Sequence, residues 1–272
     1  MRVLVLTFFF CCFACQSADS HDSNPTPTLL SENEMLAPAA APTSALLTPF
    51  HLTDSIPLLT DAAVSPRAYF DIRSLEATSD NDKLNTTINT ALGRAIAGDE
   101  APMRVKDLPR TVRAFVSNEA KIYRQQEVDT ALLNATMAPY EQELRTSTVV
   151  LYQTERFLTL ETTQYYYAGG AHGIHYTDIH NFDLLSATRI TFEDLFDTTD
   201  NAGLAVALRN ASAVKNPDLL PTQNVGITAE GFIFKYPPYT ISSNTDGEVD
   251  ILLPYEVAKD YLSESALSLL GI

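Results

Sequence analysis

Cysteine is absent from the chain after Cys15, and the three cysteines present are Cys11, Cys12 and Cys15. The folded part is therefore expected to contain no disulfide, no cysteine-ligated zinc site and no thiol nucleophile. Tryptophan is absent as well, so 12 tyrosines and 13 phenylalanines must supply the aromatic part of the core.

Basic residues are scarce: 18 lysines and arginines stand against 34 acids, which gives a net charge of −16. Nucleic-acid binding is not expected, because phosphate contacts need a basic surface. The acidity is uneven, since residues 3–66 hold six acids and no base, and residues 140–272 hold 18 acids and 7 bases. Such an acidic C-terminal half either favours a cationic partner or serves the solubility of an exported protein.

The N-terminus predicts export. Arg2 precedes a largely apolar run, Val3–Ala14, which is too short to span a bilayer and is typical of a signal peptide. Ala14 before Cys15, followed by polar residues, predicts that residues 1–15 are a lipoprotein signal peptide and that Cys15 carries the lipid. The alternative is ordinary secretion with cleavage nearby. The chain is thus expected to be anchored to a bacterial membrane through lipid alone, facing the periplasm or the cell exterior.

Residues 16–60 are rich in proline, alanine, serine and threonine and contain no glycine. This composition predicts a disordered tether, although residues 46–59 are apolar enough to dock on the folded domain.

Helical patterns mark residues 61–139 as an N-terminal α+β subdomain. After a strand at residues 68–75, a helix capped at residues 80–82 should end near Gly98; its apolar stripe is Leu84, Ile88, Leu92 and Ile96. A second helix begins at Pro109. Its outward bases could form a binding face or a solvated one; they are Arg110, Arg113, Lys121 and Arg124.

Strand patterns dominate residues 140–272. Strands are expected at residues 146–153, 156–168, 176–184 and 249–253, and a strand pair is expected within residues 227–236. The predicted fold class is α+β, an antiparallel β-sheet with helices packed on one face.

A glycine-rich corner joins two of these strands. Gly169, Gly170 and Gly173 are expected to form a structural turn between the strand that ends at residues 165–167 and the strand that returns through residues 175–184. We name residues 169–173 the glycine corner.

The nearby histidines raise the question of a metal. His172, His175 and His180 lie close to Asp178 and Asp183 in the sequence. Strand alternation points His175 away from the face of Asp178 and His180, so structural or surface histidines are favoured over a metal site. No metal, cofactor or catalytic residue is predicted, although the carboxylate pairs Glu193/Asp194 and Asp246/Glu248 keep a hydrolase reading open.

Aromatic side chains give the candidate binding surface. Three consecutive tyrosines on a strand cannot all face inward, and an exposed tyrosine favours contact with proteins or sugars. The alternative is a half-buried sheet face. The predicted surface comprises Tyr165, Tyr166, Tyr167, His172, His175, Tyr176, Phe234, Tyr236 and Tyr239.

Several stretches resemble the RsiV-like extracytoplasmic domain, the ectodomain of a lysozyme-sensing anti-sigma factor. They are residues 165–173, 181–184, 190–196, 232–239 and 249–255. On this resemblance residues 140–272 are the RsiV-like domain, and the strand and helix before it resemble the small domain that usually precedes it, which is also found beside a peptidoglycan deacetylase.

The resemblance implies an α+β domain without a cofactor and, in the anti-sigma members, binding of lysozyme. We expect neither the intramembrane relay of those proteins nor deacetylation, because the corresponding segments have no counterpart in the chain. The main hypothesis is a lipid-anchored envelope binding protein that recognises a lysozyme-like cationic protein or a cell-wall glycan, more a binder than an enzyme. The alternatives are a cell-wall-directed hydrolase and a structural envelope lipoprotein.

Overall fold

The computed structural model describes residues 46–60, 62, 64–241 and 247–272. The expected signal peptide, Cys15, residues 16–45 of the tether and Asp246 lie outside this range. In the part of the chain that is described, no helix is long and apolar enough to cross a membrane.

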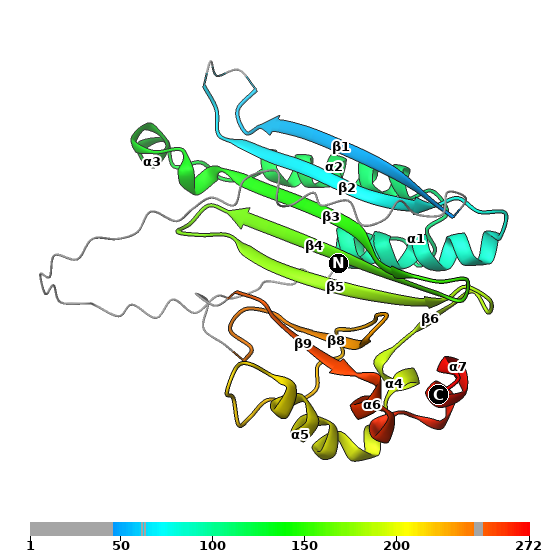
Figure 1. The fold of residues 1–272 in the computed structure, drawn as a ribbon. Coiled ribbons are helices and arrows are strands. Elements are labelled where there is room, and N and C mark those ends of the chain that lie inside the picture. The colour runs from blue at the N-terminus through cyan, green and yellow to red at the C-terminus, as the bar shows by residue number, and fades with distance from the viewer. Residues whose placement is uncertain (1–45, 61, 63, 242–246) are drawn as a thin grey trace, which may run out of the picture. The chain divides into compact units, whose positions relative to one another are not determined.

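A six-stranded sheet forms the larger layer, with its strands in the order of the sequence (Figure 1). All neighbours are antiparallel except β2 and β3, which run parallel. The strands are β1 (Leu47–Pro57), β2 (Arg67–Ala77), β3 (Gln142–Gln153), β4 (Phe157–Ala168), β5 (Ile174–Asp183) and β6 (Thr188–Ile190). The mostly antiparallel sheet confirms the expected fold class.

Strand β1 corrects the predicted extent of the tether, because residues 47–57 pair with β2 along their whole length. Two prolines, Pro49 and Pro57, lie in this strand. Proline cannot donate to a β-ladder, but β1 is an edge strand and tolerates it. Leu47 and Ile56 are buried in the core, which offsets the entropy lost when the segment is ordered.

Two long helices, α1 (Asp82–Ala97) and α2 (Leu108–Arg124), cover one face of this sheet (Figure 1). The Asn81 side chain caps α1 by accepting from the Leu84 N–H, and Asp107 caps α2 in the same way. The apolar stripe predicted for α1 is fully buried against the strands. Two short elements, α3 (Thr130–Ala135) and the 3₁₀ turn η3 (Ala138–Tyr140), lead into β3.

A three-stranded antiparallel sheet packs on part of the other face. It consists of β7 (Val225–Ile227), β8 (Gly231–Tyr236) and β9 (Val249–Pro254), with β8 in the middle. Buried hydrogen bonds join the two sheets: Thr159 donates to the Ile227 carbonyl, and the Asn181 side chain donates to the Val225 carbonyl. The helices around the small sheet are α4 (Phe192–Leu195), α5 (Asn201–Ala211), α6 (Tyr255–Ala258) and α7 (Glu264–Leu270).

The hydrophobic residues form two cores, which do not divide at the boundary predicted between residues 139 and 140. The first core extends from Leu46 to Ala187 and the second from Ile190 to Ala266. The reason is that β3, β4 and β5 complete the sheet that β1 and β2 begin, so their inward side chains join the first core. All the described residues, from Leu46 onward, belong to one compact unit.

Candidate functional site

The face of the large sheet opposite α1 and α2 carries rows of aromatic and charged side chains near the glycine corner. Strand register places Glu143 between Tyr69 and Tyr167. In the next row, Arg145 pairs with Tyr165, and Tyr165 pairs with His175. Neighbouring strands are about 4.8 Å apart, so these side chains contact one another across the sheet.

A groove of about 400 Å³ runs over these rows. We name it the tyrosine groove; its lining residues are Tyr69, Glu141, Gln142, Glu143, Tyr165 and Tyr167. Tyr69 is 43% exposed, which leaves much of its ring available to a partner. The groove thus presents three tyrosines and two carboxylates on a regular sheet, a rigid support.

Electrostatic contacts hold the centre of the groove in place. The Arg145 guanidinium lies 2.6 Å from a Glu143 carboxylate oxygen and 5.8 Å from the centroid of the Tyr165 ring. On its other side, the Tyr165 ring lies 4.6 Å from the His175 ring, centroid to centroid. Glu141 forms no ion pair within the described residues, so its charge is available at the rim.

The glycine corner supports the tyrosines. Gly169 has a φ of +69°, and a Cβ there would overlap the Pro139 carbonyl, so the chain turns tightly against η3. A Cβ on Gly173 would overlap the Tyr165 ring, so the absent side chain leaves room for that ring. The Tyr167 hydroxyl lies 3.1 Å from both the N–H and the carbonyl oxygen of Gly170. The sequence predicts the turn, but not that it seats Tyr165 and Tyr167.

Two predicted surface tyrosines lie on the opposite face of the same strands. Tyr166 is 42% exposed and near Glu119 of α2; burial and then that carboxylate raise its pKa. The Tyr176 hydroxyl donates to the Gln164 side chain, and burial and then Asp178 raise its pKa. These tyrosines therefore do not belong to the groove, and His172 is exposed in the corner without lining it.

The prediction of Phe234 and Tyr236 as surface residues is wrong. They are 0% and 1% exposed and lie in the second core, because the middle strand β8 points alternate side chains into it. The Tyr236 hydroxyl donates to the Leu220 carbonyl, and burial raises the pKa of Tyr236 to about 12. Tyr239 is exposed, but it follows β8 and does not line the groove.

The histidines and acids considered as chemical groups are separated. His180 is buried, and burial followed by the charge of Arg189 lowers its pKa to about 3, whereas His172 and His175 are exposed. Within the described ranges, no three histidines, cysteines or acids are grouped so as to hold a metal ion. Asp194 is engaged in the capping box of α4, and Glu193 accepts from the Gln223 amide.

Comparison with known proteins gives two family matches. The model described as "Deacetylase PdaC" matches residues 67–175, and the model described as "Protein of unknown function (DUF3298)" matches residues 193–256. The tyrosine groove lies entirely within the first segment. No curated protein matches the chain.

Two solved structures share the fold. A DUF3298 family member from Bacteroides fragilis aligns with a TM-score of 0.72 and 20% identity, over 83% of this chain and 96% of that one. A DUF3298 family protein from Pseudomonas aeruginosa PAO1 aligns with a TM-score of 0.56 and 13% identity, over 81% and 96%. The finer RsiV-like assignment stays a prediction. The chain therefore joins a segment similar to the PdaC family to a segment similar to the DUF3298 family, on a fold shared with solved DUF3298 proteins.

Proposed function

We propose that the protein is an extracytoplasmic binding protein, held at the membrane by lipid on Cys15, that recognises a cationic, lysozyme-like protein through the tyrosine groove. One observation carries this proposal: three tyrosines and two carboxylates converge in an open groove on a rigid sheet. The PdaC and DUF3298 matches support an extracytoplasmic domain of this kind.

The composition of the groove suits a protein partner. Tyrosine supplies a large apolar area and a hydroxyl at a low cost in side-chain entropy, and it is enriched at the centres of protein interfaces. Glu141 at the rim and the net charge of −16 attract a cationic surface from a distance and accelerate its association. A wall glycan is the alternative occupant, since sugars also stack on tyrosine.

Binding is favoured over wall hydrolysis because several side chains considered as catalytic groups are buried or engaged in hydrogen bonds. Asp194 and Glu193 are engaged in structural hydrogen bonds, and His180 is buried beneath the sheet surface. In contrast, the tyrosine groove presents the exposed ring of Tyr69 and the carboxylate of Glu141, which forms no ion pair within the described residues.

The test is binding of a cationic lysozyme to the immobilised protein at about 50 and 200 mM salt. We expect binding that weakens at the higher salt, and we expect Tyr69→Ala to weaken it roughly tenfold or more, as truncation of an interface anchor does. Tyr166→Ala is the matched control, because Tyr166 is 42% exposed against 43% for Tyr69 and lies on the opposite face. Equal losses in both variants, or no binding by the parent protein, would contradict the proposal.

A glycan assay separates the alternatives. If the protein binds chito-oligosaccharide but not lysozyme, and Tyr69→Ala weakens that binding, the ligand of the groove is a wall glycan and not a protein. Release of acetate from an acetylated wall glycan by the purified protein would instead favour an enzyme.

The anchor has its own test. Mass spectrometry of the mature N-terminus should find a lipid-modified cysteine at position 15, and an unmodified residue there would refute the anchor.

A further inference from the structure

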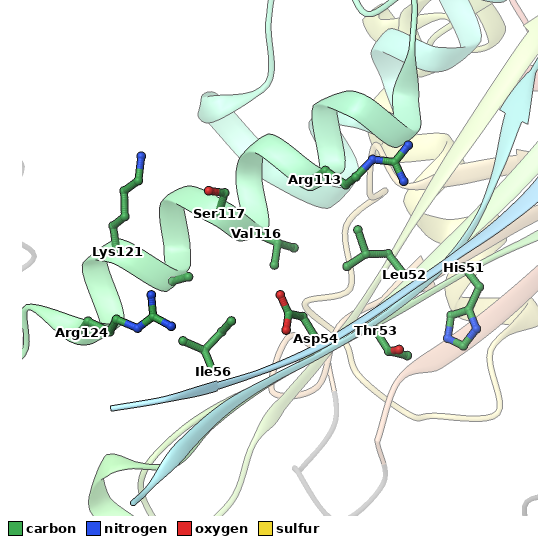
Figure 2. A pocket seen from close by; sticks show the side chains of 11 residues that line it. His51, Leu52, Thr53, Asp54, Ile56, Arg113, Val116, Ser117, Lys121 and Arg124 are labelled. Carbon is green, nitrogen blue, oxygen red and sulfur yellow. The ribbon is translucent and has the colours of Figure 1, made fainter. Parts of the chain in front are cut away.

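A second groove lies on the helix-covered side of the large sheet, between the edge strand β1 and helix α2 (Figure 2). Its volume is about 670 Å³, within the range of known ligand sites. We name it the helix-edge groove; it is lined by His51, Leu52, Thr53, Asp54, Ile56, Arg113, Val116, Ser117, Ala120, Lys121 and Arg124.

The helix side of this groove is basic in a strongly acidic chain. Arg113, Lys121 and Arg124 project from α2, and none of them makes an ion pair within 4.0 Å or a side-chain hydrogen bond in the described part of the chain. The one acidic residue of the lining is Asp54, whose carboxylate accepts from the Ser55 N–H. Three unpaired cations against one carboxylate leave the groove net positive, although the protein carries −16.

The strand side of the groove includes the backbone edge of β1. Consecutive strand residues point to opposite faces, yet His51, Leu52, Thr53 and Asp54 all line the groove. The hollow must therefore reach the outer edge of β1, where the strand has no neighbour in the sheet among the described residues. An edge strand presents a row of unpaired N–H and C=O groups.

The position of the prolines limits where a new strand could pair. Pro49 and Pro57 have no N–H, so the uninterrupted edge is residues 50–56, and the lining residues of β1 fall within that stretch. Leu52, Asp54 and Ile56 share the helix-facing side of β1, so the Asp54 carboxylate lies between two apolar side chains, opposite Val116 of the helix (Figure 2).

We propose that the helix-edge groove binds an extended acidic peptide segment, which adds to the large sheet as a strand beside β1. Main-chain hydrogen bonds between the peptide and residues 50–56 supply an affinity that does not depend on the peptide sequence. Carboxylates of the peptide directed at Arg113, Lys121 and Arg124 supply the preference for acidic peptides. This site is independent of the tyrosine groove, because it lies on the other side of the sheet and attracts the opposite charge.

The first experiment uses a fluorescent peptide of alternating valine and glutamate, about nine residues long, and the same peptide with lysine in place of glutamate. Fluorescence anisotropy with the purified protein should show saturable binding of the acidic peptide, weaker at higher salt, and at least tenfold weaker binding of the basic one. Equal binding of both peptides, or binding of neither, would overturn the proposal.

Methylated peptides test the strand pairing itself. An added strand bonds to β1 through the N–H groups of one edge, that is, of alternate residues. Of two acidic peptides, one N-methylated at odd and one at even positions, one should lose binding and the other should keep it. Loss of both or of neither would contradict strand addition even if acidic peptides bind.

Charge variants locate the site. Lys121→Gln with Arg124→Gln removes two cations from the groove and should weaken the acidic peptide roughly five- to thirtyfold. The matched control is Arg104→Gln with Lys106→Gln, two exposed cations outside the lining. Thermal unfolding of both variants checks that the fold is kept. Equal weakening in both pairs would assign the binding to net charge and refute the site.

Discussion

Replacement of His180 should remove an acid sensitivity that is built into the first core. The imidazole lies on β5, is 4% exposed, and neither ring nitrogen has a hydrogen-bond partner in the described part of the chain. Burial, and then the positive charge of Arg189, lower its pKa from 6.5 to about 3. Asp178 is itself half-buried, and burial raises the pKa of its carboxyl.

The sign and size of the effect follow from the lowered pKa. The unfolded state takes up a proton as the pH falls below about 6.5, and the folded state does not until the pH is near 3. The stabilising contribution of neutral His180 is therefore complete above pH 6.5 and is lost as the pH falls. At 1.36 kcal/mol per pH unit, the loss between pH 7.5 and pH 5 is about 2 kcal/mol. Any folded pKa well below 5 gives the same loss over this window.

Urea unfolding of the parent protein and of His180→Leu at pH 7.5, 6 and 5 measures this loss. Other titrating groups are present in both proteins, so the difference between their free energies of unfolding isolates His180. Leucine is similar in volume and needs no hydrogen bond, and the variant should gain about 2 kcal/mol on the parent as the pH falls to 5. A difference independent of pH would show that the folded protein protonates His180 freely, and the reasoning would fail.

Three further predictions concern stability and are checked by urea or thermal unfolding. Gly169→Ala should lower the free energy of unfolding by about 2 kcal/mol or more, because Gly169 has a positive φ and a Cβ there overlaps Pro139. Gly170→Ala should lower it much less, because the space at its Cβ is open. Equal losses in the two variants would contradict the described turn. Lys235→Met should lower the free energy of unfolding by about 2 kcal/mol, because the carboxylates of Glu161 (3.1 Å) and Asp250 (2.9 Å) lose their cation. Adding Glu161→Leu to that variant should restore part of the lost stability. An unchanged stability in Lys235→Met would contradict this expectation. Asn181→Ala should lower the free energy of unfolding by about 3 kcal/mol, because its side chain bonds Val225 and Ile227 of the small sheet and Thr159 of its own sheet; a loss below about 1 kcal/mol would show that these bonds matter little.

Local patterns in the sequence were sufficient for the elements that stabilise themselves locally. Helix α1 has a capping residue and a regular apolar stripe, and both are used as predicted. The glycines of the corner predict the hairpin of β4 and β5, and the chain turns at these glycines. The stretch from Thr191 to Asp194 is another local signal, and both hydrogen bonds of a capping box form there at the start of α4.

Features that depend on distant pairing were not visible in the sequence. Strand β1 contains two prolines and a composition typical of a tether, and only its pairing with β2 makes it a strand. The parallel contact of β2 with β3 bridges the whole helical segment, so nothing local in the sequence indicated that Tyr69 lies beside Glu143. This contact creates the tyrosine groove, which explains why the prediction found Tyr165 and Tyr167 but missed Tyr69 and Glu141.

The error at Phe234 and Tyr236 has a related cause. Alternating aromatics on a strand are compatible with an exposed face or a buried one, and the choice depends on what covers the strand. Residues of α4, α5 and α6 supply that cover for β8, and their packing could not be read from the strand itself.

The central claim is that the glycine corner seats the tyrosines of a binding groove, and Gly173→Ala tests it most directly. The added methyl group overlaps the outer end of the Tyr165 ring, which can swing away, so the fold should keep its melting temperature within a few degrees. Affinity for a cationic lysozyme should fall roughly tenfold, because the displaced ring no longer completes the groove. Unchanged affinity in a folded Gly173→Ala protein that binds lysozyme would contradict the account.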